Sequence, residues 1–441
     1  MHSRINSPRQ TLFVVERSHL WPIRIFLVSL VIPWLVNIGP VTLSLYRIVL
    51  LGALLPCLYN WLSGKCGRIR LSDAAVFMFC LWGSLSTIVT RGAGAAVEPA
   101  GILVIETAGA YLLARCYIRS AADYRSMAIL FVGVTLSILP LAAIESISGQ
   151  SVALDIYGIV LPTIPEAFEG MRMGLRRAQG VYEHPILLGV NAACAFALAY
   201  LVAGNGSPFW RRTFLAGAVA LTAAFSLSSA PLGVIALQFA LIAWNGTMRA
   251  VPQRWLVLWS TALVLFLLIE GFSNRSAIEL YISYLSFNPY NGWYRMLIWQ
   301  YGTAAVMSAP WFGIGFADWP RPDWMTPSVD NFWLAMAMRH GLPAVLFLLA
   351  ALLAATIAVL RRRADAVIYR YRLAYLAVLG GLFMVGCTVH FWNSSHVLFM
   401  FMLGSGLWIS EAEQSSATEM DRPPRALRGG IGVSGLRPLA M

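Results

Sequence analysis

The sequence predicts an all-α, polytopic integral membrane protein with about 12 transmembrane helices. Of its 441 residues, 59% are hydrophobic and only 12% are charged, whereas about a quarter of the residues in soluble domains are charged. The mean hydropathy is +0.69, and apolar runs of about 20 residues recur between short charged connectors. These runs fill most of the chain, so we expect one integral membrane domain over residues 1–412 and a disordered cytoplasmic tail over 413–441.

Each apolar run is predicted to be a helix, because a helix satisfies its own backbone hydrogen bonds in lipid. The first run follows several arginines and lacks a small-residue cleavage site, which indicates an anchor and not a cleaved signal. The expected spans are 21–38, 40–62, 72–90, 97–117, 125–147, 184–203, 211–228, 230–248, 254–272, 343–360, 371–391 and 396–411.

The distribution of arginines predicts the orientation of these helices. Most basic residues fall in alternate connectors and at the two ends of the chain, so the positive-inside rule places both termini in the cytoplasm. Two long loops, at about 148–183 and 273–342, then face outward. If the apolar segment 296–312 crossed the membrane as one additional span, the later basic connectors would lie on the outer side, against the positive-inside rule. We therefore expect an interfacial helix over 293–308, ended by Pro310, and a second short helix near 331–342.

The formal net charge of +12 does not indicate nucleic-acid binding. Lys65 is the only lysine, no basic stripe alternates with aromatic residues, and basic residues in a membrane protein usually report orientation. The six cysteines form no C-x2-C pair, and the outer loops show no obvious cluster of carboxylates. We therefore expect no metal and no cofactor.

The early loop ends in GMRMGLRRAQGVYEHPILLGVN, which places Arg172, Arg176 and Arg177 on the outer side of the membrane. Arginines on this side run against the charge rule. One explanation is an anionic ligand, because the guanidinium fork matches the geometry of phosphate. The other is contact with lipid headgroups or pairing with Glu166 and Glu169.

The late loop brings Tyr294 and Arg295 to the start of the interfacial helix and Asp330 and Asn331 to the start of the short helix. Between them, PWFGIGF predicts a tight turn and not a nucleotide loop, because no strand precedes it and no phosphate-loop lysine follows. Asp330 either caps the backbone donors of the short helix or acts as a general base.

Polar residues also fall within or beside the predicted spans. Arg47 and Glu106 lie about 10 to 15 Å below the outer ends of their helices, where they either pair with each other or serve a function. His390 and His396 flank an outer turn and are expected to be interfacial polar residues and not ligands.

Three blocks of the sequence resemble a known family. RAQGVYEHPILLG, then YRMLIWQYG with SAPWFGIGFADW, and then VDNFWLAMAMRHGLPAVLFLL are similar to successive blocks of the O-antigen ligase and O-antigen polymerase family of bacterial envelope enzymes. In that family, arginines at positions similar to Arg177 and Arg295 engage a lipid-linked pyrophosphate. The ligases carry a histidine before the asparagine of the third block, where this sequence has Asp330 before Asn331. This difference favours a polymerase.

The resemblance implies a metal-independent, inverting glycosyl transfer at the outer face of the bacterial inner membrane. The donor is a polyprenyl-pyrophosphate-linked oligosaccharide, the acceptor is a glycan hydroxyl, and the expected partners include membrane lipid and a chain-length regulator. Asp330 is the expected base, with His340 and His184 as alternatives. We expect catalytic roles for Asp330, Arg295 and Arg177, and substrate contacts from Arg176, Arg172, His184, Tyr294, Asn331, His340 and Arg47.

Other functions remain open from the sequence. A ligase would transfer finished polymer to lipid A core or to another acceptor. A transporter or lipid flippase also suits about 12 spans, but the sequence shows no obvious repeated halves and places its reactive residues in the outer loops. A non-catalytic assembly partner is a third alternative.

Overall fold

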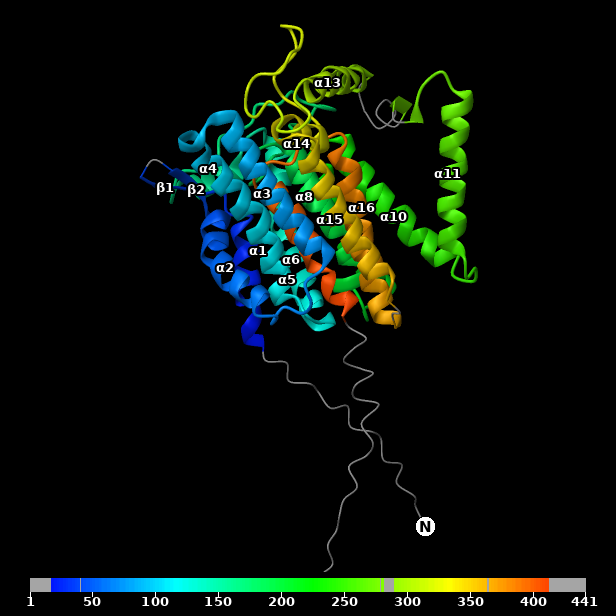
Figure 1. Cartoon of the computed structure of the whole chain (residues 1–441). Helices are drawn as coiled ribbons and strands as arrows, with labels where there is room; N and C mark the ends of the chain where they lie inside the picture. Colours follow the sequence, from blue (N-terminus) through cyan, green and yellow to red (C-terminus); the bar gives the residue numbers. More distant parts are fainter. Residues whose placement is uncertain (1–16, 40, 278, 281–288, 363–364, 412–441) are drawn as a thin grey trace, which may run out of the picture.

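The computed structural model describes residues 17–39, 41–277, 279–280, 289–362 and 365–411, which form a bundle of helices (Figure 1). Within this part of the chain, nine helices are long and apolar enough to cross a membrane. The prediction of a mostly helical protein with many membrane-spanning helices is therefore confirmed at this level. The predicted tail over 413–441 lies outside the described residues.

The bounds of the elements are as follows. The nine candidate spans of the described chain are α2 (Leu45–Leu62), α3 (Leu71–Arg91), α4 with η2 and α5 (Ala93–Val104, Ile105–Gly109 and Ala110–Tyr117), α6 (Ala121–Ser148), α8 with η3 (Pro185–Leu198 and Ala199–Ala203), α10 (Ser229–Thr247), α11 (Arg254–Phe272), α15 (Leu342–Leu360) and α16 (Ala366–Gly386). The other elements are η1 (Arg17–Leu20), α1 (Trp21–Ser29), β1 (Leu35–Ile38), β2 (Val41–Ser44), α7 (Val152–Gly158), α9 (Phe209–Ala224), α13 (Pro289–Ser308), α14 (Phe332–His340), α17 (Ser394–Ser405) and η4 (Leu407–Ser410).

Three of the expected spans, 21–38, 211–228 and 396–411, are not among these nine helices. They correspond to α1 with 9 residues, to α9 with 16 residues, and to α17 with η4 over Ser394–Ser410. The expectation of one helix over 21–38 is wrong beyond Ser29, and the next helix begins at Leu45 and not at residue 40.

A two-stranded hairpin replaces the end of the first expected span. β1 and β2 pair antiparallel, with Leu35 opposite Ser44, and Gly39 adopts a positive φ of 61° between the strands. The backbone N–H of Leu35 donates to the carbonyl of Pro162 at 2.8 Å, so the early loop continues the pairing. An apolar run rich in β-branched residues suits a strand as well as a helix, which is why composition alone gave the wrong element.

α8 and α17 form the centre of the bundle. Every residue of α17 and all but one of α8 are buried, and α5, α9, α10 and α16 pack against them. In contrast, α11 has no buried residue and stands apart from the other helices (Figure 1). Its first turn is tied to α16, where Trp255 Nε1 donates to the Tyr369 hydroxyl at 2.9 Å, and the rest of this apolar helix suits contact with lipid.

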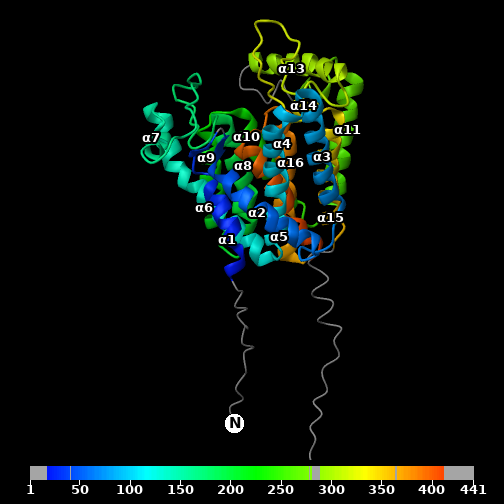
Figure 2. The same ribbon diagram turned by 60° about the vertical axis from the view of Figure 1, so that its left-hand side comes forward.

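Both long loops lie at one end of the bundle, which we name the loop end. α7, α13 and α14 lie there, whereas α1 begins and η4 ends at the opposite end (Figures 1 and 2). The helix expected over 293–308 is present as α13, which lies across the loop end in both views. α14 corresponds to the second short helix expected near 331–342.

α13 covers α14 through a small apolar core of its own. Ile298 and Val306 of α13 are buried together with Leu334 and Met338 of α14 and with Trp319 of the connecting segment. This core is separate from the main core of the bundle. The late loop is therefore a packed unit that holds α14 against the ends of the spanning helices.

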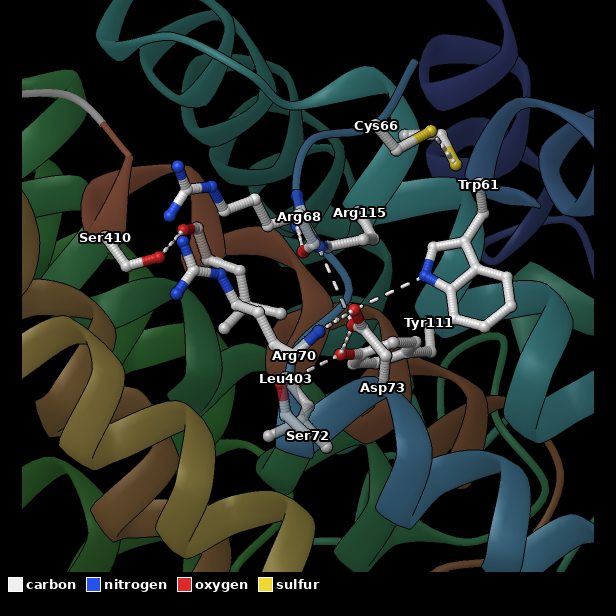
Figure 3. Close-up of polar contacts among 12 residues, drawn as sticks. Trp61, Cys66, Arg68, Arg70, Ser72, Asp73, Tyr111, Arg115, Leu403 and Ser410 are labelled. Atoms are coloured by element: carbon white, nitrogen blue, oxygen red, sulfur yellow. Dashed lines mark hydrogen bonds and ion pairs between the residues drawn. The ribbon is translucent and has the colours of Figure 1, made fainter. Parts of the chain in front are cut away.

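A buried polar cluster ties the opposite end together (Figure 3). Asp73, at the start of α3, accepts hydrogen bonds from the backbone N–H of Arg70 at 2.8 Å and from the Tyr111 hydroxyl at 2.5 Å. Arg115 lies 3.7 Å from Asp73 and donates to Glu411 at 2.9 Å. The carboxylates are fully used within the cluster, so it fastens the end of the described chain to α3 and α5.

Gly341, between α14 and α15, provides a test of this architecture. It adopts a φ of 81°, and an added Cβ would lie 1.9 Å from the Trp311 carbonyl oxygen. Gly341→Ala should lower the unfolding temperature of the purified protein, because the backbone strain alone costs about 1 kcal/mol and the contact adds to it. Gly380→Ala is the matched control, since Gly380 lies within α16 and a Cβ there meets no atom within 4 Å. Equal unfolding temperatures for the two variants would contradict this account of the junction.

Candidate functional site

Two adjoining cavities lie at the loop end. The loop cavity has a volume of about 490 Å³, and the helix cavity has a volume of about 240 Å³. Phe316, Arg339 and Trp392 line both, so the two cavities meet at these side chains. The loop cavity is lined further by residues of 314–319 and 327–329 and by Ala335, Met338 and His390, and the helix cavity is lined among others by Arg47, Glu106, His340, Asn393 and His396.

α14 places Arg339 at this junction. The helix begins at Asn331, whose side-chain oxygen accepts a hydrogen bond from the backbone N–H of Leu334 at 2.9 Å. Ala335, Met338 and Arg339 follow at helical spacing and lie on one face, which borders the loop cavity. The short helix thus carries a cationic side chain to the point where the two cavities join.

Two side chains of α3 fix the end of α14. Trp82 Nε1 donates to the carbonyl oxygens of Trp311 and His340, at 3.1 Å in each case. Ser86 Oγ donates to the carbonyl oxygen of Phe312 at 2.6 Å and to that of Arg339 at 3.3 Å. Carbonyls at the end of a helix have no partner within the helix, so these bonds satisfy them and hold the Arg339 backbone in place.

Arg339 makes no ion pair with any acidic residue in the described part of the chain, and burial alone lowers the pKa of its guanidinium group. The guanidinium lies over the ring of Phe316, 5.3 Å from the centroid, and Arg91 lies 4.6 Å from the same centroid. Two cations on one ring leave a concentration of positive charge beside the cavities, which favours an anionic ligand.

Two buried histidines accompany Arg339. Burial and the charge of Arg339 lower the pKa of His340 and His390, so both imidazoles are neutral near pH 7. Neither ring nitrogen of His390 bonds to another described residue, and Nδ1 of His340 also lacks a partner there. A neutral imidazole offers one donor and one acceptor to a ligand. His390 and His396, which are expected to be interfacial polar residues, both have side chains buried within the protein.

The Arg47–Glu106 ion pair forms one wall of the helix cavity, which confirms the pairing considered from the sequence. Arg47 Nε lies 2.8 Å from the Glu106 carboxylate, and another guanidinium nitrogen donates to Asn393 at 2.9 Å. Nearby, Glu183 accepts a hydrogen bond from Ser394 at 3.4 Å, and burial raises the pKa of the Glu183 carboxyl group. The charge of Arg47 is therefore balanced within the protein.

The arginines of the early loop bind to the protein itself. Arg176 pairs with Glu166 and donates to the Gly149 carbonyl at 2.6 Å, and Arg172 donates to the Leu227 carbonyl at 2.7 Å. These bonds fasten the loop to the ends of α6 and α9. The pairing explanation offered for this loop therefore accounts for the contacts of Arg176.

Arg177 is also engaged by the protein. It pairs with Glu169 and donates to Ser228 Oγ at 2.9 Å. Burial and the nearby charge of Arg172 lower the pKa of Arg177, and the charges of Glu169 and Asp330 oppose that shift. Arg177 thus joins the early loop to the start of α10.

His184 has both ring nitrogens in use. Nδ1 accepts from the backbone N–H of Ile186 at 3.1 Å and caps α8, so Nε2 carries the proton and donates to Glu169 at 2.8 Å. The ring packs against Trp392, with centroids 6.1 Å apart. In this arrangement His184 has no free lone pair to act as a base, and it supports a wall of the two cavities.

Asp330 lies beside the loop cavity and does not cap α14. Its carboxylate accepts a hydrogen bond from Ser328 Oγ at 3.0 Å, and Ser328 and Val329 both line the loop cavity. The capping role considered for Asp330 belongs to Asn331, which is buried and whose Nδ2 lacks a partner among the described residues. This leaves the Asp330 carboxylate free for another task.

Tyr294 and Arg295 lie in the first half of α13. The Tyr294 hydroxyl lies 2.8 Å from Thr326 Oγ1, and Trp293 stacks on Trp324 with centroids 5.7 Å apart. These contacts hold the late loop against α13. Arg295 is half-buried, and neither Tyr294 nor Arg295 lines the two cavities described above.

The sequence did not single out Arg339, Phe316 or Trp392 as site residues. The sequence did contain a signal for Arg339, because the positive-inside rule predicts few arginines in the outer loops. Its lack of an acidic neighbour depends on the folding of distant segments. Comparison with known proteins adds no assignment, since no family model matches the chain and no curated protein matches it.

The Arg47–Glu106 pair can be tested by a double-mutant cycle. Arg47→Ala and Glu106→Gln should each lower stability, by about 3–5 kcal/mol, because each leaves a buried charge or polar group without its partner. The double variant should lose less than the sum of the two. Thermal unfolding of the purified protein measures these changes, and the Asp318–Arg321 pair, whose carboxylate is exposed, is the control, with little expected change. Strict additivity for Arg47 and Glu106 would contradict a coupled pair.

Proposed function

We propose that this protein is a membrane glycosyltransferase of the bacterial inner membrane. It moves a glycan from polyprenyl pyrophosphate to an acceptor sugar hydroxyl, and it polymerises O-antigen or exopolysaccharide repeat units. The observation that carries this proposal is the loop cavity, where aromatic rings and Arg339, which has no acidic partner among the described residues, lie near the Asp330 carboxylate. Aromatic faces suit sugar rings, and a cation suits an anionic group of a glycan substrate.

The orientation of the chain supports this proposal. The end opposite the cavities carries the basic connectors, among them Arg68, Arg70, Arg115 and Arg119. By the positive-inside rule that end faces the cytoplasm, so the loop end faces outward. Lipid-linked glycans at the outer leaflet then have access to the cavities.

The proposed reaction is an inverting displacement. The acceptor oxygen forms a bond to the anomeric carbon, while the bond from that carbon to the pyrophosphate oxygen breaks and its electron pair leaves with the pyrophosphate. The proton of the acceptor hydroxyl passes to Asp330 as the new bond forms, because a sugar hydroxyl is too weak an acid to ionise beforehand. Arg295 of α13, which lies outside the two cavities, is the cation that this proposal assigns to the charge developing on the leaving pyrophosphate.

Arg177 has a positioning role in this proposal. Glu169 already offsets most of its charge, and its contacts with Ser228 and Glu169 join the early loop to the bundle. Its charge also acts on Asp330 from the early loop.

The ligase is the second candidate, and Asp330 in the place of the ligase histidine favours the polymerase. Deletion of the gene separates the two. Loss of a polymerase leaves single repeat units on the acceptor, whereas loss of a ligase leaves long lipid-linked chains.

Substitution of Asp330 tests the proposed base. Asp330→Asn should reduce polymer formation in cells by about 10²–10⁴-fold, which is the usual contribution of a general base. Asp323→Asn is the matched control, because Asp323 is an exposed carboxylate of the same loop. Arg295→Ala should abolish long polymer as well, since it removes the cation assigned to the leaving group.

Polymer length is read from the ladder of lipid-linked or surface glycan, and membrane insertion is checked by the amount of full-length protein in the membrane fraction. Normal ladders in the Asp330→Asn and Arg295→Ala strains, with normal protein amounts, would contradict these assignments.

A further inference from the structure

The arginines at the loop end differ in whether they have an acidic partner. Arg47 pairs with Glu106, Arg176 with Glu166, Arg177 with Glu169 and Arg321 with Asp318. Arg339, in contrast, has no acidic partner in the described part of the chain, although it is largely buried and lines both cavities. A desolvated guanidinium without a counter-ion is costly, and an anion bound in the cavity would remove that cost.

The surroundings of Arg339 define what kind of anion fits. His390 is almost completely buried in the wall of the loop cavity, and neither of its ring nitrogens bonds to a described residue. Phe316, Trp319 and Trp392 line the same cavity. The site thus combines one cation, a neutral hydrogen-bonding ring and apolar aromatic faces.

We infer that Arg339, together with His390 and the aromatic wall of the loop cavity, binds the carboxylate of an acidic sugar in the glycan substrate. One guanidinium fork matches one carboxylate with two parallel hydrogen bonds. The aromatic faces of the cavity suit a sugar ring that carries the carboxylate, whereas a pyrophosphate has no ring face to place against them. The inference rests on the proposed glycan substrate and specifies its class as an acidic polysaccharide repeat.

Phe316 and Arg91 complete this site. The Phe316 ring contacts both guanidinium groups, at 5.3 Å from Arg339 and 4.6 Å from Arg91. The ring therefore holds Arg339 at the junction of the two cavities, while the like charge of Arg91 strengthens the local positive potential. The cradle is built from α3, α14 and the late loop, all of which the hydrogen bonds of Trp82 and Ser86 hold together.

Direct binding tests this inference without turnover. The full-length protein, purified in detergent, is titrated with methyl glucuronide, with methyl glucoside as the neutral sugar of the same shape, and with inorganic pyrophosphate, and saturation-transfer NMR detects weak binding. The glucuronide should bind about tenfold or more tightly than the glucoside, as expected for a charge-assisted pair of hydrogen bonds. Arg339→Gln should remove this preference, and Arg339→Lys should keep only part of it, because lysine has no planar fork.

The control is Arg275→Gln, which removes one exposed arginine of the same end of the bundle and should leave the preference unchanged. Unfolding temperatures show that each variant is folded. Equal binding of the two glycosides, or a preference that persists in Arg339→Gln, would overturn the inference. So would binding of pyrophosphate but not glucuronide through Arg339, because that result assigns Arg339 to the donor phosphate. These outcomes are separate from the Asp330→Asn test, which follows polymer formation.

Discussion

The hydrogen bonds from Trp82 and Ser86 of α3 to the carbonyl oxygens at the end of α14 are the constraint on which the loop end depends. α14 is too short to hold a fixed position through its own backbone bonds. The bonds from α3 fix its end, and the small core beneath α13 fixes its outer face. Arg339 can therefore remain buried at the junction of two cavities without an acidic partner.

Most of the spanning helices were predictable, because an apolar run of about 20 residues must form a helix in lipid. The start of the chain was not. The run from Leu35 to Ser44 is as apolar as a span, but it forms a hairpin that pairs with the early loop through Pro162. α17 and η4 together extend over Ser394–Ser410, close to the expected 396–411, but this stretch is shorter than the nine candidate spans of the described chain.

Only part of the site was predictable from the sequence, because the partners of its charged residues depend on the fold. The depth of Arg47 and Glu106 in neighbouring helices indicated a pair, and they form one. The unusual arginines of the early loop did require an explanation, but their partners are the acidic residues of that loop, which become neighbours only after folding. Arg339 was missed because its important property is that no acidic residue of the described chain pairs with it. A sequence alone does not show which residues become neighbours.

The central claim is that the loop end catalyses glycosyl transfer and is not part of a transport pathway. The most direct measurement uses the purified protein in liposomes with lipid-linked repeat units and no ion gradient. A glycosyltransferase should produce longer lipid-linked glycans and release one polyprenyl pyrophosphate for each glycosidic bond formed. Movement of unchanged lipid-linked glycan across the bilayer, with no new glycosidic bond, would contradict the account.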